Sequence, residues 1–171
     1  MTGAASTRKK LRFDDHPLDG VEDILGRQEW HYARLNRNEI FMDLRGQYGS
    51  YHILFLWEDD MAALQIGVEY HLRIADSAYQ EACCLINEMN GQVWAGRFVL
   101  AGETMIPTYR AVHLLRHIQT GREMTNILED LLTLTIDECD AHYPAFMVLA
   151  SEKTHDEEQL ALALMPVAGV S

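Results

Sequence analysis

Apolar and polar residues alternate without interruption between Leu64 and Ile74. Side chains on a strand point alternately to its two faces, so this pattern predicts a strand with one buried and one polar face. The segment Tyr51–Trp57 differs, because Leu54 and Leu56 make its second face apolar as well. Apolarity on both faces is typical of an interior strand. We therefore expect these two strands to be adjacent in the middle of a sheet.

Four other segments have the composition and spacing of strands. The first four strands would be joined by short polar loops, which predicts an antiparallel meander. Pro107 cannot donate a ladder hydrogen bond, so its strand should begin there or lie at a sheet edge. The four additional segments are Trp30–Leu35, Ile40–Leu44, Val93–Leu100 and Ile106–Leu115.

Apolar residues at intervals of three and four predict four helices. Pro144 should kink or end the longest of them, because proline removes one helical hydrogen bond and crowds the preceding turn. A capping box at Thr154–Glu157 opens the last helix, and Pro166 ends it. The helices are expected near residues 17–28, 77–90, 122–142 and 154–165.

These elements follow one another in the order α-β4-α-β2-α-α, which gives an α+β fold with an antiparallel sheet of about six strands. No repeat or low-complexity linker divides the chain. We expect a flexible basic tail over residues 1–15, a single domain over residues 16–166 and a short tail over residues 167–171.

The chain is acidic, with a formal net charge of −12. Four of its 14 basic residues, between Arg8 and Arg12, precede every one of the 26 acidic residues, so the rest of the chain carries −16. Nucleic-acid binding needs clustered Lys and Arg, and so acidic a body argues against it. No apolar run reaches the roughly 20 residues of a membrane span, and no secretory signal is present. The three cysteines cannot form a disulfide framework, which favours the cytoplasm.

The sequence contains no recognisable catalytic motif. Phosphate-binding glycine loops, the zincin His-Glu-x-x-His pattern, Cys-x-x-Cys pairs and the Gly-x-Ser-x-Gly elbow are all missing. Asp137, Glu138 and Asp140 gather near the end of a helix, where they could hold a cation or form a solvated acidic face. We expect no catalytic residue, no metal site and no cofactor, and therefore no enzymatic activity.

Aromatic residues on the predicted strands allow two interpretations. They fill the core between sheet and helices, or one sheet face has more apolar surface than the helices of the chain cover, which leaves a patch for a partner. We expect Arg110 on an edge strand, next to Tyr109. The candidate partner-binding residues are Leu54, Leu56, Trp94, Phe98, Tyr109 and Arg110.

An ordered series of short motifs runs along the chain: Gly46-Gln47-Tyr48-Gly49-Ser50-Tyr51, Trp57-Glu58-Asp59-Asp60, Ala63-Leu64-Gln65, Leu85-Ile86-Asn87, Trp94-Ala95-Gly96-Arg97-Phe98, Tyr109-Arg110 and Tyr143-Pro144-Ala145-Phe146. In this order and spacing the motifs resemble the YbjN family, which is known as a family of bacterial sensory transduction regulators. The resemblance covers residues 17 to 165. It implies a fold similar to type III secretion chaperones, with a twisted antiparallel sheet, helices on one side, and a dimeric, acidic protein. It implies no reaction and no cofactor.

Two functions follow as hypotheses. The first is a non-enzymatic protein-binding module, a homodimeric adaptor or chaperone-like regulator that binds an unidentified protein partner through its sheet. The second is a small-molecule sensor or enzyme with a pocket between sheet and helices. A flat apolar groove favours the first, and a concave cavity with convergent polar groups favours the second.

Overall fold

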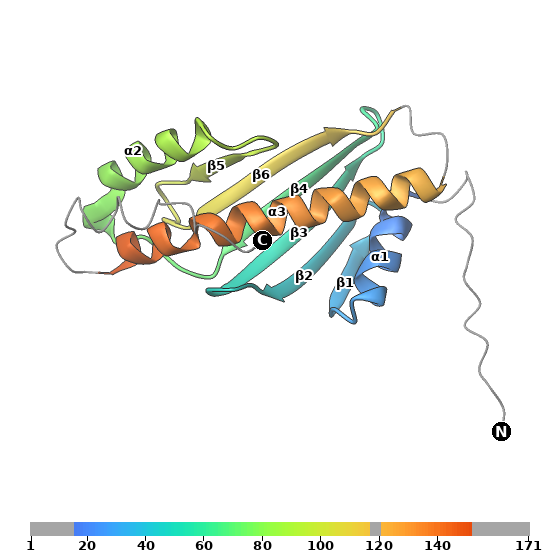
Figure 1. Cartoon of the computed structure of the whole chain (residues 1–171), viewed down its shortest axis with the longest axis horizontal. Helices are drawn as coiled ribbons and strands as arrows, with labels where there is room; N and C mark the ends of the chain where they lie inside the picture. Colours follow the sequence, from blue (N-terminus) through green and yellow to red (C-terminus); the bar gives the residue numbers. More distant parts are fainter. Residues whose placement is uncertain (1–15, 117–120, 152–171) are drawn as a thin grey trace, which may run out of the picture.

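The computed structural model describes residues 16–116 and 121–151, and Figure 1 shows their arrangement. Six strands and three α-helices account for most of them, and a short 3-10 helix, η1, leads into the second α-helix. In chain order the elements are α1 (Pro17–Arg27), β1 (Tyr32–Asn36), β2 (Glu39–Arg45), β3 (Ser50–Glu58), β4 (Ala63–Tyr70), η1 (Asp76–Ala78), α2 (Tyr79–Asn90), β5 (Arg97–Leu100), β6 (Pro107–Leu114) and α3 (Gly121–Ala150).

All six strands form one antiparallel sheet in the order β1-β2-β3-β4-β6-β5. The first four make the expected meander, and β3 and β4 are adjacent interior strands, as their patterns predict. The chain then crosses over through α2 and returns as a hairpin. The second strand of that hairpin, β6, pairs with β4 and lies between β4 and β5. The fold is α+β, as predicted.

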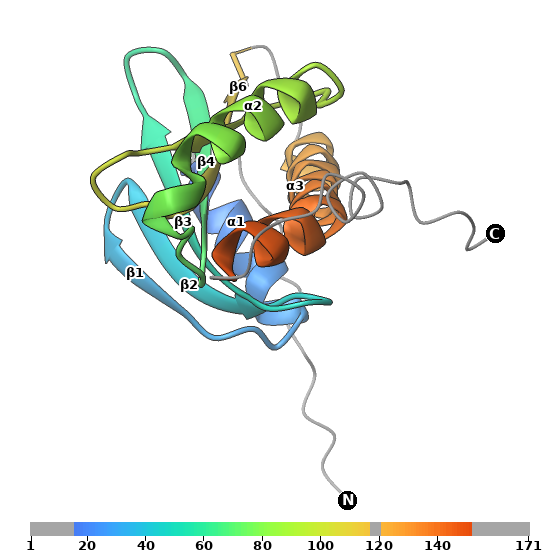
Figure 2. The ribbon, with the colours of Figure 1, turned by 90° about the vertical axis from the view of Figure 1, so that its left-hand side faces the viewer.

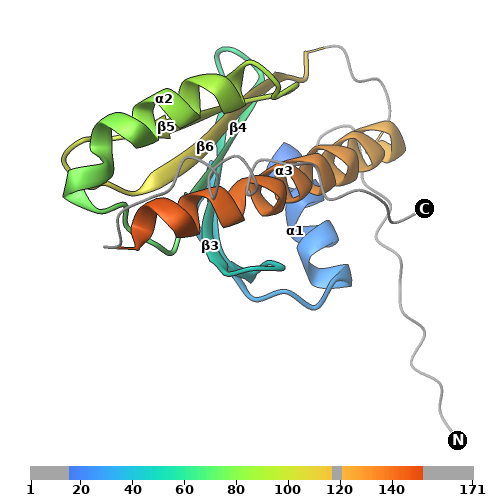
Figure 3. The same ribbon diagram turned by 60° about the vertical axis from the view of Figure 1, so that its left-hand side comes forward.

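The three helices lie on one side of this sheet (Figures 2 and 3). Alternate side chains of β3 and β4 point toward them, so Ile53, Phe55, Ile66 and Val68 are almost fully buried. The longest helix, α3, crosses the strands from one end of the sheet to the other (Figure 3). The apolar core therefore occupies a single layer between the sheet and the helices.

The longest helix continues through Pro144 to Ala150, so the expected end of the helix near that residue is wrong, and a kink there stays a prediction. Proline in a helix interior costs about 3 kcal/mol. Beyond it, Ala145, Phe146 and Leu149 are fully buried. Each large buried side chain contributes about 1.5–3 kcal/mol, so this burial offsets the cost of the proline.

Two strands are shorter than their patterns suggest. The strand β4 ends at Tyr70, so Leu72 and Ile74 follow it in an extended connection, and β5 begins at Arg97 instead of Val93. Ile74 is nevertheless buried, and its N–H donates to the carbonyl of Met105. Buried and exposed side chains therefore continue to alternate up to Ile74, although the hydrogen-bond ladder of β4 has ended at Tyr70. The expected helix over residues 154–165 and both tails lie outside the described residues.

The turn between β2 and β3 is attached to α3. Asp140 accepts hydrogen bonds from the Tyr51 hydroxyl (2.5 Å) and from the Gln47 N–H (3.1 Å). The Tyr143 ring lies against Gly49, where a Cβ would overlap the tyrosine hydroxyl. The glycine is therefore required by close approach, and it lets the helix sit directly on the turn.

Candidate functional site

The sheet face opposite the helices is not covered by any described element. We call it the open face. It consists of the alternate residues of each strand that point away from the core, and it is partly apolar. Leu54, Val112 and Leu114 expose 38%, 58% and 58% of their surface there. The residues of the open face used below are Phe41, Asp43, His52, Leu54, Leu56, Gln65, Gly67, Glu69, Arg97, Thr108, Arg110 and Val112.

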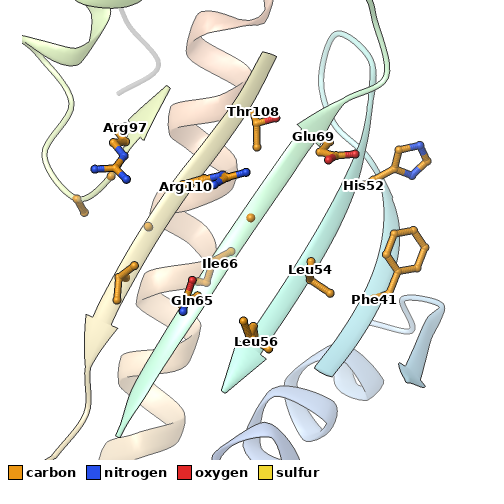
Figure 4. Close-up of a pocket in the computed structure, with 15 residues that line it drawn as sticks. Phe41, His52, Leu54, Leu56, Gln65, Ile66, Glu69, Arg97, Thr108 and Arg110 are labelled. Carbon is orange, nitrogen blue, oxygen red and sulfur yellow. The ribbon is translucent and has the colours of Figure 1, made fainter. Parts of the chain in front are cut away.

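The middle of the open face is hollowed. The hollow has a volume of about 600 Å³ and spans the strands from β2 to β5. Figure 4 shows its side chains on one side of the strands and α3 behind them. Gly67 forms part of its floor, and a Cβ added there would meet only the carbonyl oxygen of Leu54, at 4.0 Å. The absence of a side chain at Gly67 therefore leaves room above β4.

Direct cross-strand partners share a face, so the register defines rows that run across the sheet. One row passes through the hollow, and we call it the central row. It runs Arg97–Arg110–Gly67–Leu54–Phe41 from β5 to β2. The row has two cationic side chains at one end, a gap in the middle and two apolar side chains at the other end.

The neighbouring row is polar. It runs Thr108–Glu69–His52–Asp43 from β6 to β2. His52 makes an ion-pair contact of 2.5 Å with Asp43, between Nδ1 and Oδ1, and its ring stacks on Phe41 with 5.8 Å between ring centroids. The Asp43–His52 pair borders the apolar end of the central row. The Glu69 carboxylate lies beside the gap in the middle of that row.

The structure brings Leu54, Leu56 and Arg110 of the sequence-predicted set together on the open face (Figure 4). Trp94 lies outside the hollow, in the connection before β5, and exposes 92% of its surface. A ring so exposed has no packing role among the described residues.

Phe98 and Tyr109 lie on the opposite face, under the helices, and expose 2% and 0% of their surface. Burial raises the pKa of Tyr109 to about 12, with smaller contributions from Cys139 and Glu138 on α3. These two aromatic side chains belong to the core, so they do not join the open face. The expected edge position of Arg110 is wrong, because β6 is an interior strand that begins at Pro107.

Sequence reasoning missed Phe41, Gly67, Arg97 and Val112. Phe41 and Gly67 occupy positions of their strands that appear polar, so the alternation alone assigns them no role. Arg97 lies beside the hollow because β5 pairs with β6, and β6 in turn with β4. Strand order is a long-range property, and local patterns do not contain it.

Neither a metal centre nor a membrane span is found in the described part of the chain. Over residues 16–116 and 121–151, no group of three or more His, Cys, Asp or Glu side chains is arranged to hold a metal ion. No helix within those ranges is long and apolar enough to cross a bilayer. Asp140, one of the acidic residues near the end of the long helix, binds the β2–β3 turn instead.

Comparison with known proteins gives one family. The model of the YbjN family, described as "Putative bacterial sensory transduction regulator", matches residues 17–147. Among solved structures, the chain is similar to YbjN from E. coli, described as "a putative transcription regulator", with 10% sequence identity and a TM-score of 0.47. That match covers 74% of this chain and 93% of the other. No curated protein matches the sequence.

Proposed function

Because the chain belongs to the YbjN family, we propose that it is a non-enzymatic protein-binding module, an adaptor or chaperone-like regulator in bacterial signalling or stress response. The family is described as a family of regulators. The proposal adds how such a regulator would act: a partner protein docks on the open face of the sheet.

One observation carries this proposal. In the described part of the chain the helices cover one side of the sheet, and the open face exposes apolar side chains in the middle of its surface. Contiguous exposed apolar surface around a hollow, with polar residues at its margin, is typical of protein interaction sites. Leu54 and Leu56 form the centre of this surface, and the Asp43–His52 pair borders it.

We also propose that the protein forms a homodimer. A second copy would cover part of the open face by a two-fold arrangement in which both subunits use the same residues. Because the partner protein would dock on the same face, a second copy and the partner would compete for it. The acidic composition supports solubility of such an assembly.

Site-specific photo-crosslinking tests the docking surface. A photoreactive phenylalanine analogue replaces Leu54 on the open face, and in a separate chain it replaces Gln80, which is exposed on α2. In cells of the host, position 54 is expected to give discrete adducts, and position 80 none. The same adducts should disappear when Leu56→Asp is added to the chain that carries the crosslinker at position 54.

The adduct masses separate the outcomes. An adduct at twice 19.5 kDa would come from a second copy, and any other discrete mass from a partner protein. Equal adducts at positions 54 and 80, or none at position 54, would contradict docking on the open face.

A small-molecule sensor is the second candidate, and the volume of the hollow favours it. About 600 Å³ lies within the range of roughly 300–1,000 Å³ typical of ligand sites. The hollow lies on the open face, away from the position between sheet and helices that the sequence suggested for a pocket. A saturable rise of the melting temperature with one metabolite from a screen, lost in a Leu54→Asp variant, would favour this second function.

A further inference from the structure

Two arginines stand side by side on the open face. Arg97 in β5 and Arg110 in β6 are direct cross-strand partners, and both are exposed. The Cβ atoms of such partners lie about 5 Å apart, and like charges placed directly opposite each other destabilise a sheet. Among the described residues, neither guanidinium has an ion pair or a hydrogen bond. The repulsion between the two arginines therefore lowers the stability of the sheet, and no interaction among the described residues offsets it.

This arrangement is unusual for so acidic a chain. Arg27, Arg34 and Arg73 each pair with a carboxylate. The carboxylate nearest to the arginine pair by register is that of Glu69, which pairs with Thr108, two residues before Arg110 on the same face. If Arg110 turned toward Glu69, the charge of Arg97 would remain unmatched. The open face thus keeps an excess of positive charge at its β5–β6 end.

The rest of the central row defines what this charge can bind. Beside Arg110, Gly67 leaves open space, and beyond it lie Leu54 and Phe41. Neighbouring strands lie about 4.8 Å apart, so Leu54 is about 10 Å and Phe41 about 14 Å from Arg110 along the row. A suitable ligand has an anionic group at one end, an apolar group that fills the space between Gly67 and Leu54, and a second apolar group near Phe41.

An extended protein segment meets both conditions. Its residues advance by about 3.3 Å each, and every second side chain points to the same side. The residue two positions after an acidic side chain would lie about 7 Å away, over the space between Gly67 and Leu54. The residue four positions after it would lie about 13 Å away, beside Phe41. The two guanidiniums can bind the carboxylate with paired, charge-assisted hydrogen bonds.

We propose that Arg97 and Arg110 form a carboxylate-binding pair on the open face. Its ligand is an extended segment of the partner protein, in which an Asp or Glu is followed two and four residues later by apolar side chains. This inference rests on the proposed function, because it assumes that a protein docks on this face. It adds the chemical class of the docking segment and its direction, with the acidic end over β5 and β6.

Two synthetic peptides test the pair on the full chain. The first is Ser-Glu-Ser-Leu-Ser-Phe-Ser with blocked ends, and the second has Gln in place of Glu. Binding is followed by the backbone amide resonances of β4 and β6. The Glu peptide is expected to bind about five-fold more tightly, since a partly exposed ion pair contributes up to about 1 kcal/mol. The preference should weaken as salt is added.

Two double variants distinguish the effect of the charges at Arg97 and Arg110 from the effect of the net charge of the protein. Arg97→Gln with Arg110→Gln should bind both peptides equally. Arg27→Gln with Arg73→Gln removes the same net charge elsewhere, and should keep the preference for the Glu peptide. Loss of the arginine pair also relieves repulsion, so the first double variant is expected to stay folded.

The outcomes are distinct from those of the crosslinking experiment. The carboxylate-binding pair is overturned if the Arg97/Arg110 double variant keeps the preference for the Glu peptide, or if neither peptide shifts the amide resonances of β4 and β6. The crosslinks at position 54 would still decide the proposed function. If inorganic phosphate at the same ionic strength displaces the Glu peptide and gives the same shifts, the pair is a small-anion site, which also overturns the assignment to a protein segment.

Discussion

Tyr51 and Tyr109 are both buried, yet their hydroxyls have different surroundings. The Tyr51 hydroxyl donates to the carboxylate of Asp140. The Tyr109 hydroxyl lies beside Gly96 and has no hydrogen-bond partner among the described residues. A hydrogen bond to a charged acceptor contributes about 1.5–3 kcal/mol, whereas an unsatisfied buried hydroxyl costs about 1–3 kcal/mol. The two tyrosines should therefore respond in opposite directions to the same substitution.

Tyr51→Phe is expected to lower the free energy of unfolding by about 2 kcal/mol, because the Asp140 carboxylate loses its hydroxyl donor. Tyr109→Phe should leave it unchanged or raise it, because the substitution removes only an unpartnered hydroxyl. Urea unfolding at pH 7 measures both. Equal losses in the two variants would contradict the difference in hydrogen bonding.

The tyrosines also predict how stability depends on alkaline pH. Burial raises the pKa of Tyr109 to about 12, and it raises the pKa of Tyr51 and Tyr70 as well. In the unfolded chain a tyrosine has a pKa of about 10. The folded state thus holds protons that the unfolded state loses above pH 10. Stability is complete below that pH and decreases as the pH rises beyond it.

We expect the melting temperature to be level between pH 8 and pH 9.5, as far as tyrosine is concerned, and to fall steadily from about pH 10 upward. Tyr109→Phe should make this fall less steep, since one group with a raised pKa is removed. Thermal unfolding followed by circular dichroism provides the measurement. An identical slope in the variant and the original chain would show that Tyr109 ionises in the folded state as it does in the unfolded state.

At the scale of elements, β3 and β4 show how two faces of one sheet differ. Val68 points into the core, and its β3 partner is Ile53. Leu54, the next residue of β3, points to the open face opposite Gly67. Val68→Asp should destabilise the protein by about 3–5 kcal/mol, because it buries an unpaired charge. Leu54→Asp should cost less than about 1 kcal/mol, since surface substitutions have small effects.

Chemical denaturation of the two variants compares the faces directly. At a protein concentration too low for dimers, a large loss for Leu54→Asp would mean that another part of the same chain covers the open face. A small loss for Val68→Asp would mean that the helices do not cover β4.

The β2–β3 turn depends on glycine where α3 approaches it. In Gly49→Ala the new methyl group would overlap the Tyr143 ring, and we expect a loss of about 2–4 kcal/mol from the strain and the displaced helix. Gly26→Ala in α1 is the matched control, because a Cβ there meets nothing within 4 Å. It should stabilise the protein by up to about 1 kcal/mol. Melting temperatures that move in the same direction for both variants would refute this difference.

Local patterns predicted most of the elements and failed at particular places. The alternation of Leu64–Ile74 identified a strand and its buried face, but it did not show that β4 ends at Tyr70, because burial of Ile74 continues beyond the ladder. Pro144 gave a wrong helix end, since the burial of Phe146 and Leu149 outweighs its local cost. Both errors arise where tertiary packing overrides a local preference.

The candidate site was less accessible to sequence reasoning than the fold. Leu54 and Leu56 were found because the strand is apolar on both faces. Arg97 was missed because its pairing with Arg110 depends on the register of the β5–β6 hairpin, and β5 begins at Arg97 instead of at the expected Val93. Trp94 and Phe98 were grouped together by spacing, and the late start of β5 separates them.

At the scale of the whole molecule, the helices within residues 16–116 and 121–151 all lie on one side of the sheet (Figure 2). We predict a homodimer at micromolar concentration, with about 1,600 Å² buried in total in a stable interface. Sedimentation equilibrium is expected to show twice the chain mass of 19.5 kDa, and Leu54→Asp should shift the equilibrium toward the single chain. A single species of 19.5 kDa for the original sequence at all concentrations would contradict the prediction.

The insertion of β6 between β4 and β5 also has a consequence for synthesis on the ribosome. When the chain has been made as far as Gly91, the meander β1–β4 is complete, but β4 has no neighbour on its outer side until residues 107–114 emerge. During that interval the backbone N–H and C=O groups on the outer edge of β4 are unpaired, and its apolar side chains Leu64, Ile66 and Val68 are exposed. Such an edge can pair with other nascent chains. Translation of the segment between β4 and β6 is therefore the period in which this protein is most prone to aggregate.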